Sequence, residues 1–136
     1  MGFIVPNTIE IEVINQLLTP ALTMRIYGNN FTPNATSIAA NFTEIAGGGY
    51  LAKPLIFANW SIVAGDPSQA TYATIQKWTF TGPINAPGTI YGYYVTRNSD
   101  GKLMWAERFP AANVPFSPIV GSVVAVLPRF DCQSFV

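Results

Sequence analysis

The stretch Gly88-Thr-Ile-Tyr-Gly-Tyr-Tyr-Val-Thr96 is dominated by aromatic and β-branched residues, which favour a β-strand. The tetrapeptide Asn98-Ser-Asp-Gly101 follows with the composition of a tight turn, and Lys102–Arg108 is β-prone again. Together these segments predict a β-hairpin. Because Gly92 has no side chain, we expect a neighbouring backbone or aromatic ring to approach the first strand closely at this position.

Four further segments have the composition or the alternation of β-strands, and turn sequences separate them. They are residues 22–27, 60–65, 70–81 and 122–130. Residues 122–130 are apolar on both faces, so we expect protein to cover both sides of this last strand. A single short helical turn is predicted within residues 36–42.

Residues 7–18 have the pattern of an amphipathic helix. Asn7 is a good N-cap, and Glu10 stands three residues later, as in a capping box. The sequence Thr19-Pro20 ends the helix. The apolar residues that fall on one helical face are Ile11, Ile14, Leu17 and Leu18. A strand is the alternative, because apolar and acidic residues alternate over residues 9–13.

These elements predict a mainly β fold, a β-sandwich or barrel with one N-terminal α-helix. The chain has 136 residues, which fits one domain over residues 1–136, with the helix at about 7–18 and strands from about 22 to 130. We expect the helix to cover an open end or an edge of the sheets. An uncovered, uncharged edge strand is prone to aggregation.

The composition favours a chain that works inside an assembly. Hydrophobic residues make up 49% and charged residues only 10%, against about 25% charged residues in an average globular protein. Seven basic residues balance seven acidic ones, so no basic excess supports nucleic-acid binding. Aromatic residues make up 13%, and interface cores are rich in aromatic residues and poor in charge. The alternative is a compact β domain with an exterior rich in Thr and Asn.

No residue pattern predicts catalysis or cofactor binding. The chain has no His and one Cys, Cys132, which excludes a His-based triad, a His metal site and an internal disulfide. Ser99-Asp-Gly-Lys102 matches the S-x-x-K string, but it lies at the predicted hairpin tip rather than on a helix. No predicted helix follows Gly47-Gly-Gly49, so this run does not form a phosphate loop. Residues 109–128 are apolar, yet their prolines exclude a membrane-spanning helix. We therefore expect no enzyme, no cofactor, no metal and no membrane partner.

Several sequence blocks stand in a characteristic order along the chain. They are the helix that begins at Pro6-Asn7, Ile26-Tyr-Gly-Asn-Asn-Phe-Thr-Pro33, Ala39-Ala-Asn-Phe-Thr-Glu44, Gly49-Tyr50, Ile90-Tyr-Gly-Tyr-Tyr-Val95 and Leu103-Met-Trp-Ala-Glu-Arg-Phe109. In these blocks the chain resembles a family of small bacteriophage virion structural proteins. The resemblance covers about residues 5–130, and its last two blocks are the most specific.

The resemblance implies a capsid decoration or cement protein that lies on the capsid exterior and is made in the host cytoplasm. Its partners would be the major capsid protein and copies of itself, with a trimer matching the local three-fold positions of a shell. Apolar segments would stabilise the shell by bridging capsomers. The resemblance supplies no catalytic residue.

We expect the ends of the chain to form the protein interface. Phe3, Ile4 and Val5 precede the helix, and Phe135 follows the last strand. The alternative is that these terminal residues are disordered or pack into the core of their own chain.

The sequence is also compatible with two other functions. A tail-fibre or receptor-binding module would stack host glycans on exposed aromatic side chains. The candidates for such a platform are Trp60, Trp78, Trp105, Tyr91, Tyr93 and Tyr94. A small hydrolase of surface polysaccharide would need two carboxylates that converge in a cleft.

Overall fold

The computed structural model of the chain describes residues 4–132. In this range the chain forms one α-helix, α1 (Asn7–Leu18), and nine β-strands. The strands are β1 (Leu22–Tyr27), β2 (Lys53–Leu55), β3 (Trp60–Val63), β4 (Ser68–Tyr72), β5 (Gln76–Thr79), β6 (Gly92–Arg97), β7 (Leu103–Arg108), β8 (Val123–Val126) and β9 (Arg129–Cys132). Short 3₁₀-helical turns lie at Ala39–Asn41 (η1), Phe57–Asn59 (η2) and Ala111–Asn113 (η3), and η1 confirms the helical turn predicted within residues 36–42.

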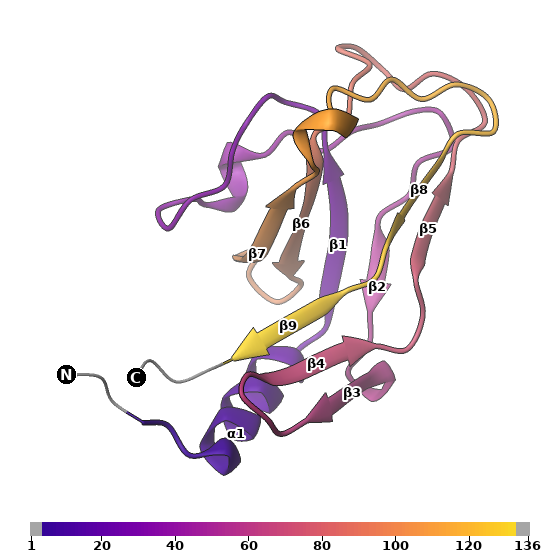
Figure 1. Cartoon of the computed structure of the whole chain (residues 1–136). Coiled ribbons are helices and arrows are strands. Elements are labelled where there is room, and N and C mark those ends of the chain that lie inside the picture. The colour runs from indigo at the N-terminus through magenta and orange to yellow at the C-terminus, as the bar shows by residue number, and fades with distance from the viewer. Residues whose placement is uncertain (1–3, 133–136) are drawn as a thin grey trace.

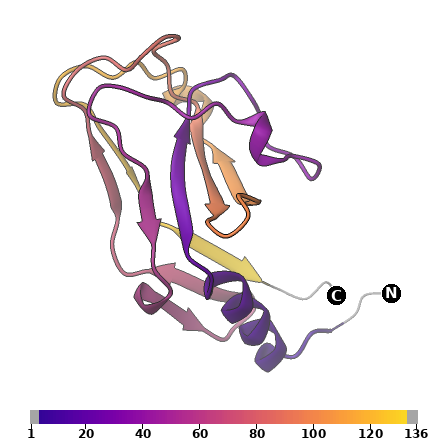
Figure 2. The ribbon, with the colours of Figure 1, turned by 180° about the vertical axis from the view of Figure 1, so that it is seen from behind.

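The strands pair in three antiparallel sheets, ordered β2-β1-β6-β7, β3-β4-β9 and β5-β8. In Figure 1 the four-stranded sheet stands opposite the β5-β8 ribbon, and the β3-β4-β9 sheet lies across their lower end beside α1. Figure 2 shows the same arrangement from behind. The predictions of a mainly β fold with an N-terminal helix and of the β6-β7 hairpin are confirmed.

The main core lies between the three sheets. Leu22, Met24 and Ile26 of β1 are completely buried. Their side chains belong to one cluster with Ala70 of β4 and Trp78 of β5, which come from the other two sheets. The apolar face of the strand at residues 22–27 therefore points into the core, as its alternation of apolar and polar residues predicts.

A second, smaller cluster covers the outer face of the four-stranded sheet. Tyr27, Phe42 and Tyr94 are buried there, and the rings of Phe42 and Tyr94 stack with their centroids 4.8 Å apart. Phe31 meets the ring of Phe42 edge-on at 5.2 Å. The segment that follows β1 thus folds back over the sheet, so β1 and β6 are covered on both faces.

The helix prediction is confirmed, but the predicted capping box is wrong. Ile14 and Leu18 are completely buried on the inner face of α1, which packs against β3, β4 and β9. The helix begins at Asn7 itself, with Pro6 at the N-cap and no capping side chain. The Pro6 carbonyl accepts the backbone N–H of Glu10 at 3.0 Å. The Glu10 carboxyl points instead into the protein, where it is 2% exposed and accepts a hydrogen bond from the Ser68 hydroxyl.

We expect Ser68→Ala to lower the free energy of unfolding by about 1–3 kcal/mol, because it removes the hydrogen bond that the Ser68 hydroxyl donates to the buried Glu10 carboxyl. Ser68 is completely buried, and its Oγ donates to Oε2 of Glu10 over 2.5 Å. Urea unfolding measures the effect. Ser61→Ala, at an exposed position of β3, is the matched control and should change stability by less than about 0.5 kcal/mol. Equal losses in the two variants would contradict this role for the Ser68 hydroxyl.

Two segments predicted as single strands are each divided in two. Residues 70–81 form β4 and β5 with a bend at 73–75, and residues 122–130 form β8 and the start of β9 with a bend at 127–128. Because β4 pairs with β9 and β5 pairs with β8, both segments leave one sheet and enter the other together. The alternation of apolar and polar residues within one segment does not show where the strand changes its pairing partner. That position depends on strands elsewhere in the fold.

The prediction that protein covers both faces of residues 122–130 is also wrong within this chain. Val123 is 52% exposed and Leu127 is 43% exposed. Val123 lies on the outer face of the two-stranded β5-β8 ribbon and Leu127 directly follows β8, with which no other sheet of residues 4–132 pairs. The apolar character of this face therefore calls for another explanation.

Candidate interaction groove

The four-stranded sheet and the β5-β8 ribbon are joined along one side. The indole Nε1 of Trp78 donates to the Leu51 carbonyl at 2.8 Å, and the Thr81 amide donates to the Gly48 carbonyl at 2.9 Å. The Asn85 amide donates to the Ala46 carbonyl at 2.8 Å. Residues 46–51 lead directly into β2, so these hydrogen bonds close the two layers on the β2 side.

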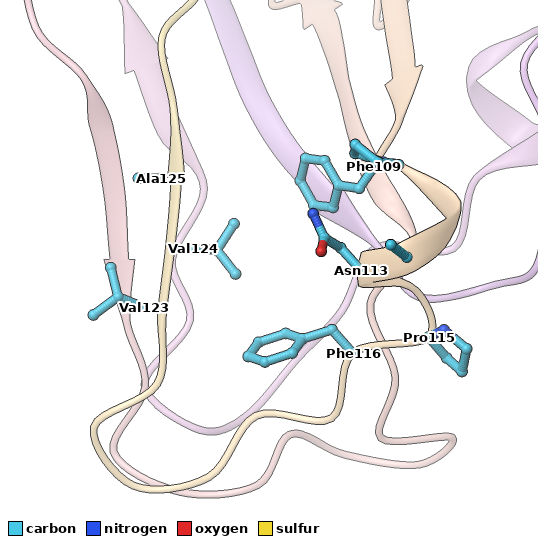
Figure 3. Close-up of a pocket in the computed structure, with 9 residues that line it drawn as sticks. Phe109, Asn113, Pro115, Phe116, Val123, Val124 and Ala125 are labelled. Carbon is cyan, nitrogen blue, oxygen red and sulfur yellow. The ribbon is translucent and has the colours of Figure 1, made fainter.

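The opposite side is open, because β7 and β8 are both edge strands. Each has a partner on one side only, and no ladder joins them in the part of the chain that the structure describes. A groove runs between them instead. In Figure 3, Phe109 and Asn113 form one wall, Val123 and Val124 lie on the other side, and Phe116 lies between the walls at one end.

The groove has two adjoining parts that share Phe109 and Ala125. The upper part encloses about 640 Å³ and lies between η3 and β8. The lower part encloses about 490 Å³ and lies between β7 and the bend from β8 to β9. Two contacts bound the groove. The rings of Trp105 and Phe130 lie 5.5 Å apart, and Ile90 and Phe116 exchange backbone hydrogen bonds at 2.8 and 3.1 Å.

The wall formed by β8 offers backbone groups and apolar side chains. In an antiparallel ladder, alternate residues direct their backbone groups away from the partner strand. Half of the β8 backbone groups therefore point away from β5, toward the groove. Residues 123–126 carry no charge. An uncharged edge strand of this kind readily adds another strand.

Charged residues line only the lower part of the groove. They are Glu107, Arg129 and Asp131. Arg129 and Asp131 lie 3.9 Å apart with about half of each side chain exposed, so their ion pair contributes little stability. Glu107 and Asp131 are both exposed to solvent. A polysaccharide hydrolase needs two carboxyl groups that converge in a cleft, one of them in a secluded environment, whereas both of these side chains lie open to solvent.

The candidate aromatic platform is not formed by the residues proposed for it. Trp60 and Trp78 are 8% and 4% exposed, and Tyr93 and Tyr94 are each 5% exposed. Trp105 is half-buried and packs on Phe130 and Trp60. The remaining candidate, Tyr91, has the Arg108 guanidinium 4.9 Å above its ring. Four of the six rings are therefore buried in the core, and only Trp105 and Tyr91 keep part of their surface exposed.

A polar cluster on β1 is also structural. The Arg25 guanidinium pairs with Glu44 at 2.9 Å, and the Tyr50 hydroxyl donates to the same carboxylate at 2.7 Å. Burial raises the pKa of Tyr50 well above its usual value, with the neighbouring Glu44 adding to the shift. The neutral hydroxyl therefore remains a donor to Glu44 while accepting the Ile26 amide at 3.1 Å. This network ties the segment after η1 to β1.

The structure describes two of the four interface residues expected at the chain ends. Ile4 is 72% exposed and Val5 is half-buried. Phe3 and Phe135 lie outside the described residues. Sequence reasoning missed the groove, although the uncharged run at residues 123–126 was its visible signal.

Comparison of the chain with family models, with curated proteins and with solved structures finds no match. Within residues 4–132, no cluster of three or more His, Cys, Asp or Glu side chains is arranged to hold a metal ion. The same residues contain no helix with the length and hydrophobicity needed to cross a membrane.

Proposed function

We propose that this chain is a structural protein of a bacteriophage virion and acts as a capsid decoration or cement protein on the shell exterior. The resemblance of blocks such as Ile90–Val95 and Leu103–Phe109 to small virion proteins supports the proposal. The observation that carries it is a surface with exposed apolar side chains in a chain that has only 10% charged residues.

Five of the thirteen exposed large apolar residues of the described chain lie on or beside the β5-β8 ribbon. We call the following set the ribbon patch: Ile75, Ile119, Val120, Val123 and Leu127, which are between 43% and 75% exposed. Val123 pairs with Thr79 and Ala125 pairs with Lys77, so the outer face of the ribbon carries a single charged side chain. Exposed apolar residues that gather in one region of a surface are typical of sites of protein–protein contact.

The proposed mechanism is passive. Burying the ribbon patch against the major capsid protein removes apolar surface from water, which contributes roughly 25 cal/mol per Å². Each copy that bridges two capsomers therefore resists their separation. A shell that carries many copies adds these contributions over all its junctions, so no catalytic group is needed.

The test is to add the purified chain to shells of its own phage from which the chain has been removed. We expect it to rebind and to raise the temperature at which the shells disrupt, and a reconstruction should place it on the exterior. Val120→Asp should weaken binding at least about tenfold, because a carboxylate would be buried in an apolar contact. Ser61→Asp, on exposed β3, is the control and should bind normally. Binding to tails or host cells in place of shells would overturn the proposal.

A further inference from the structure

Two loops at one end of the molecule contain no charged residue. Residues 80–91 lead from β5 to β6, and residues 109–122 lead from β7 to β8. We call these two segments the neutral loops. All seven basic and seven acidic residues of the chain lie outside them. Figure 1 shows both neutral loops at the end of the molecule opposite α1.

The charge that follows most closely along the chain lies on another face. Arg108 directly precedes the second neutral loop, but its guanidinium lies above the Tyr91 ring and donates to the Phe31 carbonyl at 3.2 Å. Phe31 and Tyr91 both pack in the cluster on the outer face of the four-stranded sheet. The upper part of the groove, between η3 and β8, is lined by uncharged residues throughout.

The neutral loops combine a hollow with an apolar projection. The hollow is the upper part of the groove, which encloses about 640 Å³. Beside it, residues 119–122 form a tight turn in which the Ser122 amide donates to the Ile119 carbonyl at 3.0 Å. Ile119 and Val120 of this turn are 67% and 75% exposed. Turns usually carry polar residues at such positions, so this apolar tip is suited to contact with another protein.

The neutral loops are held in place before any partner binds. The Phe80 amide donates to the Ser122 carbonyl at 2.8 Å, and the Gly121 amide donates to the Phe80 carbonyl at 2.8 Å. Proline restricts the backbone further, because its ring fixes φ. The prolines of the two loops are Pro83, Pro87, Pro110, Pro115 and Pro118. A surface that is already ordered loses little conformational freedom on binding, which favours affinity.

We infer that the neutral loops and the upper groove face the shell, where they contact an uncharged, apolar surface of the major capsid protein. The inference rests on the proposed function, which supplies the partner. A charged partner surface would lose its hydration here without gaining an opposite charge. An anionic lipid surface attracts basic residues, and the neutral loops contain none. In this orientation α1 points away from the shell.

An isosteric charge tests the chemistry of this contact. Asn113 lines the upper groove and is exposed, and Figure 3 shows it on one wall beside Phe109. We expect Asn113→Asp to weaken binding to stripped shells at least about tenfold, because the shape is kept while a carboxylate loses its hydration. Asn7→Asp, exposed at the start of α1, makes the same change at the opposite end and should bind normally. Equal affinities of the two variants would overturn the inference.

The salt dependence of wild-type binding is the second readout. Contact between uncharged surfaces is not screened by salt, whereas exposed charge pairs are. We expect the affinity for stripped shells to fall less than about twofold between about 50 mM and about 500 mM NaCl. A steeper fall would mean that charged groups hold the chain on the shell, and it would overturn the inference.

Cysteine labelling tests the orientation in a Cys132→Ser background, which removes the one native thiol. A maleimide reagent is added to Asn113→Cys and to Asn7→Cys, each free and bound to shells. We expect the shell to protect Asn113→Cys at least about tenfold in labelling rate and to leave Asn7→Cys as reactive as in the free protein. Protection of Asn7→Cys, no protection of Asn113→Cys, or protection of Asn113→Cys by self-association of the free chain would overturn the inference.

Failure of this inference can be told apart from failure of the proposed function. If wild type binds shells but Asn113→Asp binds equally well and Asn113→Cys stays reactive, the decoration function stands and the neutral loops are not the contact. If wild type binds no shell at any salt concentration, the decoration function is lost, and the inference is lost with it.

Discussion

Gly92→Ala is expected to lower the free energy of unfolding by at least about 3 kcal/mol, the upper range for overpacking a well-packed core. A methyl group at this position of β6 would lie 2.7 Å from the hydroxyl of Tyr27 and closer still to the carbonyl oxygen of Glu107 on β7. Neither neighbour can move away easily. The carbonyl belongs to the paired backbone of β7. The Tyr27 ring is completely buried, lies 4.9 Å from the ring of Phe42, and donates its hydroxyl proton to the Phe31 carbonyl at 3.0 Å.

Urea unfolding of Gly92→Ala beside Gly82→Ala measures this effect. A methyl group at Gly82 would meet no atom within 4 Å, and the backbone there is not in the left-handed region. The control should therefore change stability by less than about 0.5 kcal/mol. If the two variants unfold at the same urea concentration, the close packing around Gly92 does not contribute to stability as we expect.

Gly92 also shows what the sequence could predict about this fold. A glycine inside an aromatic β-strand lowers stability unless a neighbouring group packs closely against it. The sequence therefore predicted a close contact at Gly92, although not that Tyr27 makes it. The α1 helix and β1 were foreseeable for a similar reason, because one periodic face has to be buried wherever the chain packs. Each of these predictions depends on residues close together in the sequence.

The features that the sequence did not predict correctly depend on residues far apart in the chain. The Asn7–Glu10 pattern of a capping box is local, but Ser68 engages the Glu10 carboxyl from 58 residues further along the chain. The run Val123–Val126 is apolar on both faces, and its periodicity does not tell whether its own chain or another one covers it. The groove arises because β7 and β8, which belong to different sheets, are left without partners on facing sides. The uncharged run at residues 123–126 signals an apolar strand, but only the tertiary arrangement shows that its free edge faces β7.

Alkaline pH is expected to unfold the protein cooperatively between pH 10 and pH 12. Burial raises the pKa of Tyr27, Tyr93 and Tyr94 from 10.0 to about 12. Nearby carboxylates add to the shift, Glu107 at Tyr93 and Glu44 at Tyr94, whereas Arg108 opposes it at Tyr27. The folded state thus favours the neutral rings. Its advantage is complete below pH 10, where the unfolded chain is also neutral, and is lost as the pH rises through the folded pKa.

The size of the effect follows from the pKa differences. A rise from 10.0 to about 12 corresponds to roughly 3 kcal/mol per ring, at about 1.4 kcal/mol for each pKa unit. The three rings together therefore approach the whole stability of a small domain, which is about 5–15 kcal/mol. The tyrosinate absorbance and the circular dichroism are followed in one titration, and the part of the absorbance that comes from these three rings should appear together with the loss of circular dichroism. Tyr94→Phe keeps the ring that stacks on Phe42 and removes one titrating group, so its transition should be less steep and lie at higher pH. If the absorbance reaches the value for all six tyrosines while the circular dichroism stays unchanged, water reaches these rings in the folded protein, and the argument from burial is wrong.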